Sequence, residues 1–269
     1  MDFNLAIICS LTFVIHLIGT LAYGARIAGV RTGHIATALT LFNLLILVSR
    51  TSNSFQAPFL AKRIETALSA APGAPPSLFA DFQWILASAA VATAFGAFLI
   101  PSTQRAFARA VAILQTRRSL WRLLVHGMHP GRLLQARHYL AIPAPANLRS
   151  FRSRGGLPWT FLGLNVFAMA LWTVGVFASL YAGALEPALR VTCSNLSSLI
   201  NGLATIVMFL LLDPQLSLMT DDVVHHRASQ SSFRSAVASL VGARLVGAVL
   251  AQFLLVPAAW LIVTVARHI

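Results

Sequence analysis

The sequence predicts an all-α, polytopic membrane protein with about six transmembrane helices, forming a single domain over residues 1–269. Hydrophobic residues make up 57% of the chain and charged residues only 10%, whereas a soluble domain carries about 25% charged residues. Six apolar runs of about twenty residues or more are long enough to cross a bilayer. Most of the molecular surface is therefore expected to face lipid.

The six expected spans follow the hydrophobicity of the chain. They cover residues 3–24, 34–60, 82–100, 159–183, 187–212 and 235–266. No basic segment precedes the first, so it is expected to be a retained span and not a cleaved signal. The second is the most interrupted, because Arg50 and its polar neighbours lie inside it and Pro58 follows. A break near residues 49–54 stays open, and no internal repeat stands out.

The basic residues predict the orientation of the spans. The chain holds nineteen arginines and one lysine against seven acids, and ten of the arginines lie in the connection 101–158, which has no acid. The positive-inside rule places that connection in the cytoplasm. With six spans, both termini then lie outside the bacterial inner membrane. Anionic lipid headgroups of the inner leaflet are the expected partners of this loop, and nucleic acid is not expected.

Part of the basic connection has helical periodicity. Phe107, Val111, Leu114, Trp121 and Val125 recur at helical spacing within residues 103–125, and most arginines lie elsewhere around the helix. This pattern predicts an amphipathic helix on the inner leaflet.

Polar side chains of several spans share faces when the spans are drawn as helices. These faces comprise Thr12, His16, Gly19, Tyr23 and Arg26 in the first span; Thr40, Asn43, Arg50, Asn53 and Ser54 in the second; Asn165 in the fourth; Ser194, Asn195, Ser198, Asn201 and Thr205 in the fifth; and Arg244 and Gln252 in the sixth. Hydrogen bonds between helices explain most of the Ser and Thr positions. His16 is open to two interpretations, a satisfied buried histidine or a proton relay.

Arg50 and Arg244 require a different explanation. An arginine at the centre of a bilayer costs about 2.5–3.5 kcal/mol on insertion scales. The seven acids all lie in loops or at span ends, so neither arginine has an obvious counter-ion in the protein. Pairing with carbonyl groups or, for Arg244, extension toward headgroups are the alternatives to a path for an anion.

The sequence therefore predicts a substrate site for an anion that combines basic groups at several depths with nearby polar groups. The candidate residues are Arg50, Arg244, Arg26, Arg31, Arg190, Asn43, Asn53, Asn195, Asn201 and His16. Arginine suits a diphosphate because its planar guanidinium donates two parallel hydrogen bonds to phosphate oxygens.

Other chemistries find little support. Cys9 and Cys193 lie in apolar segments without metal-ligand spacing, and the adjacent His225 and His226 are expected to be solvated, so no metal or cofactor is predicted. No phosphate-binding loop of an ATPase occurs.

Three segments carry a resemblance to a known family. IHLIGTLAYGARIAGVRTG (15–33), ALTLFNLLILVSRTSNSFQAP (38–58) and LLDPQLSLMTDD (211–222) resemble the Amj family of bacterial alternate lipid II flippases. The resemblance implies movement of an undecaprenyl-diphosphate-linked disaccharide-pentapeptide from the inner to the outer leaflet for peptidoglycan synthesis. It brings no established site motif, so the residues above come from the physical argument alone.

The expected function is that of a flippase that works by alternating access without ATP hydrolysis. Three alternatives stay open: export of another anionic lipid or a small anion, hydrolysis of a lipid diphosphate within the membrane, and a scaffold that recruits cell-wall enzymes without transport.

Overall fold

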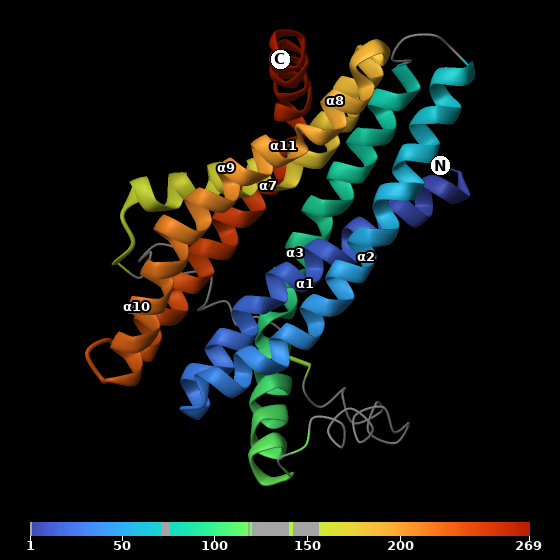
Figure 1. The fold of residues 1–269 in the computed structure, drawn as a ribbon. Coiled ribbons are helices and arrows are strands. Elements are labelled where there is room, and N and C mark those ends of the chain that lie inside the picture. The colour runs from blue at the N-terminus through green and yellow to red at the C-terminus, as the bar shows by residue number, and fades with distance from the viewer. Residues whose placement is uncertain (1, 71–75, 118, 120–139, 142–155) are drawn as a thin grey trace.

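A computed structural model describes residues 2–70, 76–117, 119, 140–141 and 156–269. The all-α expectation is confirmed: the described part contains six helices long and apolar enough to cross a membrane (Figure 1). In chain order the elements are α1 (Phe3–Thr32), α2 (Ile35–Ala70), α3 (Pro76–Arg117), α7 (Trp159–Leu185), the 3-10 turn η3 (Pro187–Leu189), α8 (Arg190–Asn195), α9 (Ser197–Val207), the π turn η4 (Met208–Leu212), α10 (Asp213–Val224) and α11 (Gln230–His268).

The helices form two units of three crossings each (Figure 1). In the N-terminal unit, α1 packs along both α2 and α3, and in the C-terminal unit α7 packs along both α11 and the α8–α9 segment. Because each unit crosses three times, the two units run in opposite directions. In both units the first helix packs against the other two, and the two units have opposite orientations in the membrane. This arrangement is typical of inverted-topology repeats in transporters.

Capping residues fix the hairpin of α1 and α2. Asp2 caps α1 by accepting a hydrogen bond from the main-chain N–H of Leu5 at 2.9 Å. Gly33 ends α1 with φ 71°, a left-handed conformation that glycine adopts without steric cost. Gly29 lies so close to α2 that a Cβ there would sit 3.0 Å from the Cα of Ile35. The chain therefore reverses sharply between the first two spans.

The discontinuous span is the fifth and not the second. α2 runs unbroken through residues 49–54 and past Pro58. The fifth crossing bends at Leu196, widens into the π turn and continues to Val224, beyond the expected end at 212. Pro214 has no main-chain N–H for an α-helical hydrogen bond, and its ring clashes with the carbonyl group of the residue four positions earlier. The π turn, in which Asp213 N–H bonds to Met208, ends directly before it.

The expected amphipathic segment is continuous with α3 as far as the structure describes it. α3 passes through Pro101 and ends at Arg117. Phe107 and Val111 are buried in a cluster with Ala25 and Ala28 of α1 and with residues of α2. This part of the apolar stripe therefore packs on protein. Residues 118 and 120–125 lie outside the described residues.

Two apolar clusters hold the units together at opposite ends of the molecule. The terminal end carries both chain termini, and the hairpin end carries the α1–α2 and α10–α11 turns (Figure 1). The terminal-end cluster includes Ile8, Phe82, Val174 and Leu255, and the hairpin-end cluster includes Ile27, Leu162, Leu216 and Phe233. Each cluster draws residues from both units, so each seals one end of their interface.

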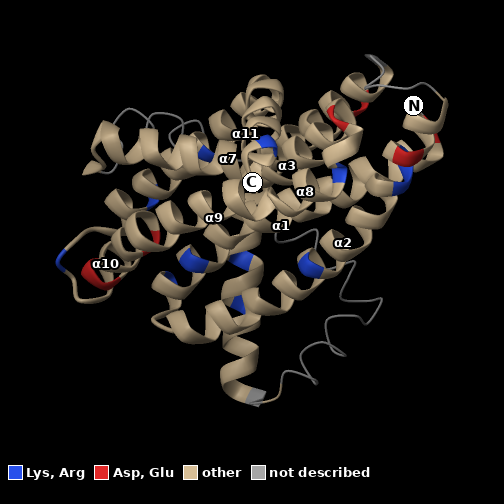
Figure 2. Cartoon of the chain, turned by 45° about the horizontal axis from the view of Figure 1, so that its top comes forward, with Lys and Arg blue, Asp and Glu red and all other residues tan. Residues whose placement is uncertain are grey.

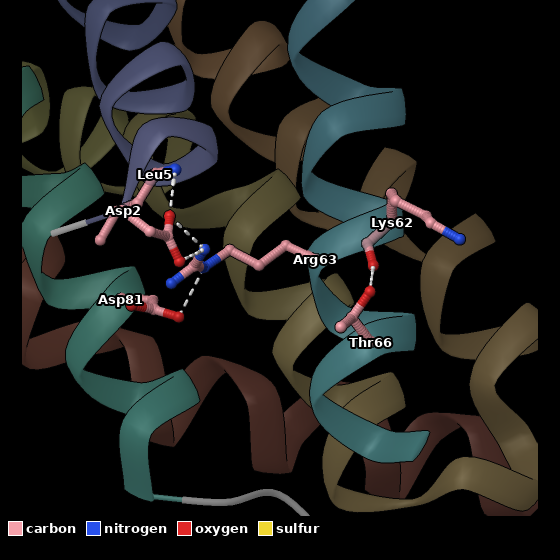
Figure 3. A network of polar contacts seen from close by, with 6 residues as sticks. All are labelled: Asp2, Leu5, Lys62, Arg63, Thr66 and Asp81. Atoms are coloured by element: carbon pink, nitrogen blue, oxygen red, sulfur yellow. Dashed lines mark hydrogen bonds and ion pairs between the residues drawn. The ribbon is translucent and has the colours of Figure 1, made fainter. Parts of the chain in front are cut away.

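Arg63 ties three segments together at the terminal end (Figure 3). Its Nε donates to Asp81 of α3 at 2.6 Å, and its Nη1 donates to Asp2 at 2.7 and 2.8 Å. Arg63 and the Leu5 N–H hold the pKa of the Asp2 carboxyl below its ordinary value of 3.8. The neighbouring Lys62 forms no ion pair among the described residues.

Replacing Gly247 tests the close crossing of α7 and α11. A Cβ at Gly247 would lie 2.6 Å from the main-chain oxygen of Val166 and 2.8 Å from the Cβ of Met169. We expect Gly247→Ala to lower the free energy of unfolding by about 1–3 kcal/mol through overpacking, measured by thermal unfolding in detergent. Gly163→Ala, in α7 with nothing within 4 Å of the added Cβ, is the control and should be neutral or stabilising. Equal effects of the two changes would contradict the close crossing.

Replacing Arg63 tests the ion network. We expect Arg63→Gln to lower the unfolding temperature by a few degrees at neutral pH, and Lys62→Gln to leave it unchanged. Because folding lowers the pKa of Asp2, its contribution is present above the unfolded pKa and is lost as pH falls through the folded pKa. The difference between wild type and Arg63→Gln should therefore shrink as the pH is lowered below about 4. A difference that stays constant with pH would exclude Asp2 from the network.

Candidate functional site: a polar belt between two apolar seals

A belt of polar side chains lies between the two apolar clusters, where the units meet. The belt residues are His16, Gly19 and Tyr23 of α1, Asn165 of α7 and Arg244 of α11. Along each of these helices, the belt residues lie between residues of the hairpin-end cluster and residues of the terminal-end cluster. Arg244 lies about 21 Å along α11 from its first residue, and Gly19 about 24 Å along α1. The belt therefore sits near the middle of the crossing.

Arg244 is held in the belt without an acidic partner. Its Nη1 contacts the sulfur of Met169 at 3.2 Å, and its buried Nε has no hydrogen-bond partner among the described residues. A Cβ on Gly19 would collide with Nη2, so the absence of a side chain there makes room for the guanidinium. The positive charge interacts electrostatically with His16 and Tyr23. A cation in this position has donor capacity left for a ligand.

A pocket opens beside the belt at its hairpin side. Its cavity volume is about 50 Å³, and it is partly open to the surroundings. Its polar lining is Tyr23, Asn165 and Asp213, and the rest is apolar or sulfur-bearing. The side-chain oxygen of Asn165, a residue only 2% exposed, has no hydrogen-bond partner in the described structure. π turns are often found at functional sites, and Met208 and Leu212 of η4 form one wall of this pocket.

Only some of the predicted site residues meet in the belt. His16, 7% exposed, and Arg244 lie together, and Arg26 is near enough to Tyr23 to interact with it. Arg50 lies on α2, which touches neither α9, α10 nor α11, so it is separated from Arg244. Its side chain is exposed and has no partner among the described side chains. The structure thus divides the two intramembrane arginines between two different surfaces.

The remaining candidates lie outside the belt. Asn43 and Asn53 are exposed on α2, Asn195 is exposed at the end of α8, and Arg31 is exposed in the last turn of α1. Asn201 of α9 is packed against α7, where a Cβ at Gly175 would collide with its side-chain oxygen. That oxygen is also buried without a partner in the described part of the chain.

Arg26 and Arg190, expected as free basic groups, each face a carboxylate of the other unit. Arg26 of α1 lies 3.8 Å from Asp213 of α10, on the hairpin side of the belt. Arg190 of α8 lies 3.5 Å from Glu65 of α2, at the terminal end. Among the described residues, the other ion pairs each stay within one unit. These two pairs therefore bridge the interface on opposite sides of the belt.

The charge distribution separates acids from the belt. Acidic residues gather toward α10 and toward the end where the N-terminus lies, whereas basic residues also occur on the helices between them (Figure 2). This agrees with the sequence, in which all seven acids fall at span ends or in loops.

Tyr23, Asn165 and Asp213 were not among the site residues predicted from the sequence. Tyr23 lies on the polar face predicted for the first span, and Asn165 is the one amide side chain in the fourth span. The sequence therefore offers a reason to consider both residues. The sequence predicts that Asp213 lies outside the fifth span, because the apolar run stops at Leu212. The π turn and α10 carry the helix past that point and place Asp213 in the pocket.

Comparisons with known proteins agree on one family. The family model described as "Amj: Alternate to MurJ" matches residues 11–266. The protein named "Lipid II flippase Amj" from Bacillus subtilis (strain 168) is 34% identical over 259 residues, which cover 96% of this chain and 94% of that relative. No solved structure matches.

Proposed function

Because the chain belongs to the Amj family, we propose that it is a flippase that moves lipid II across the membrane for peptidoglycan synthesis. The observation that supports this mechanism best is the buried guanidinium of Arg244, which lies between two apolar seals without a carboxylate partner. A transported anion supplies the missing charge. The relative's function favours transport over the hydrolase and scaffold alternatives.

The diphosphate is the part of the substrate that the arginines bind. In the belt, Arg244 donates to phosphate oxygens, and charge-assisted hydrogen bonds of this kind contribute about 1.5–3 kcal/mol each. Arg50 and Asn53, exposed on α2 and apart from the belt, contact the headgroup on a second surface of the protein. Arg31, Asn43, Asn195 and Asn201 lie outside the belt and stay proposed contacts of the substrate away from it.

Alternating access follows from the two seals. Both apolar clusters are packed and both interunit ion pairs are formed here, so each lies between the belt and one end of the molecule. Rocking of one unit against the other opens the hairpin end or the terminal end in turn, as inverted repeats do in other transporters. The phosphate groups compete with Asp213 and Glu65 for their arginines. No ATP hydrolysis takes part.

The protein lies in the bacterial cytoplasmic membrane with its hairpin end toward the cytoplasm and both termini outside. This orientation places the basic connection 101–158 against anionic lipids of the inner leaflet, as the positive-inside rule requires.

Arg244→Met tests the belt. We expect the rate of lipid II flipping in proteoliposomes to fall about 10- to 150-fold, which corresponds to the loss of about 1.5–3 kcal/mol of charge-assisted hydrogen bonding. The unfolding temperature should stay the same or rise, because an unpaired buried charge is removed. Arg234→Met, on the exposed first turns of α11, is the matched control with unchanged flipping. Flipping at the wild-type rate by the Arg244→Met variant would disprove the role of the belt.

Exchanging Arg190 and Glu65 tests the terminal-end ion pair. Arg190→Glu and Glu65→Arg should each slow flipping several-fold by placing like charges across the interface, and the double exchange should recover most of the rate. The pair Arg267 and Glu186, which lies at the same end but within one unit, is the control, and its exchange should leave flipping unaffected. If the double variant stays as slow as the singles, Arg190 acts as a substrate ligand and does not gate.

A further inference from the structure

The pocket beside the belt is built for hydrogen-bond donors and not for anions. Asn165 presents a side-chain oxygen that is buried and unpaired among the described residues, and Asp213 adds a carboxylate. Both atoms accept hydrogen bonds, so both repel a phosphate oxygen. A buried acceptor left without a donor costs about 1–3 kcal/mol. The pocket therefore favours a ligand group that carries hydroxyl or amide hydrogens.

Cationic groups adjoin these acceptors directly. Tyr23 lines the pocket and also interacts with both Arg244 and Arg26, while Asn165 lies beside its hydroxyl. The site thus has two chemically distinct halves, a cationic half on the belt side and an acceptor half in the pocket. A ligand that fills both carries an anionic group next to a group rich in O–H or N–H donors.

A glycosyl diphosphate has this pattern, because the sugar hydroxyls and any acetamido N–H lie next to the phosphates. A bare polyprenyl diphosphate has only the anionic part. The aromatic ring of Tyr23 and the apolar wall from Phe161 and Leu240 also suit the less polar face of a sugar ring.

We propose that Asn165, Asp213 and Tyr23 form a subsite for the sugar that is linked to the diphosphate, with Arg244 holding the phosphate. This inference rests on the proposed function and names how the flippase distinguishes a sugar-bearing lipid from the bare carrier lipid. The hydrogen bond that a sugar donor makes to the oxygen of Asn165 is lost when the carrier alone is bound.

The test compares two lipids on the purified full chain in detergent. The protein is titrated with lipid II or with undecaprenyl diphosphate, and the affinity for each lipid is measured by native mass spectrometry. We expect Asn165→Leu to bind lipid II about tenfold more weakly, the equivalent of one net hydrogen bond, and to bind undecaprenyl diphosphate as wild type does. Arg244→Met should weaken both lipids.

Two further variants separate recognition from folding. Asn165→Gln retains an uncharged acceptor oxygen at the position and should retain the preference for lipid II. Asn4→Leu changes an exposed asparagine at the start of α1 and should bind both lipids as wild type does. The unfolding temperature of Asn165→Leu should change by at most a few degrees, because the loss of an unpaired buried acceptor offsets the loss of the hydrogen bond between Asn165 and Tyr23.

Three results would overturn the proposal: Asn165→Leu retains the full preference for lipid II, it loses both lipids equally, or wild type has no preference. In the first case the pocket holds only water. Failure of the proposed function gives a different result, since wild-type protein would then flip no lipid II in proteoliposomes whatever its preference in detergent.

Discussion

The structure depends on a positive charge that is kept near the middle of a membrane-spanning bundle without a negative partner. Arg244 is tolerated there because Gly19 leaves space on α1 and Gly247 lets α11 approach α7 closely. Apolar clusters on both sides keep the belt apart from either end of the molecule. An unpaired buried cation is costly, and local costs of this kind are common at functional sites.

The helices form two units, and this charge lies where the units meet. The N-terminal and C-terminal units each pack two helices on a central one and cross in opposite directions. Their interface contains the belt, two apolar seals and two ion pairs. None of the described helices belongs to both units. The π turn before Pro214 supports the same site, because it carries the fifth crossing past the pocket and places Asp213 in its wall.

The sequence located one half of the site better than the other. Arg244 and His16 fall on polar stripes that the structure brings together, because neighbouring helices bury their polar faces against one another. Arg50 follows the same sequence logic but lies exposed on α2, which has no contact with α9, α10 or α11. Periodicity identifies which residues share a face and does not identify the partner of that face. The break that the sequence left open near residues 49–54 is absent from α2, and the fifth crossing is the interrupted one, at Leu196 and at the π turn before Pro214.

The sequence by itself determined the class of the protein: six long apolar runs, a basic connection and acids confined to the span ends require a bundle of membrane helices with cations inside it. The hydrophobicity and charge of each segment can be read from the chain without knowing which segments pack against it. Only the tertiary structure decided that Arg26 and Arg190 face carboxylates of the opposite unit and that Asn165 has none of the donors it needs among the described residues. Those facts depend on residues up to 187 positions apart, and hydrogen bonds and ion pairs are set by the three-dimensional distances between side chains.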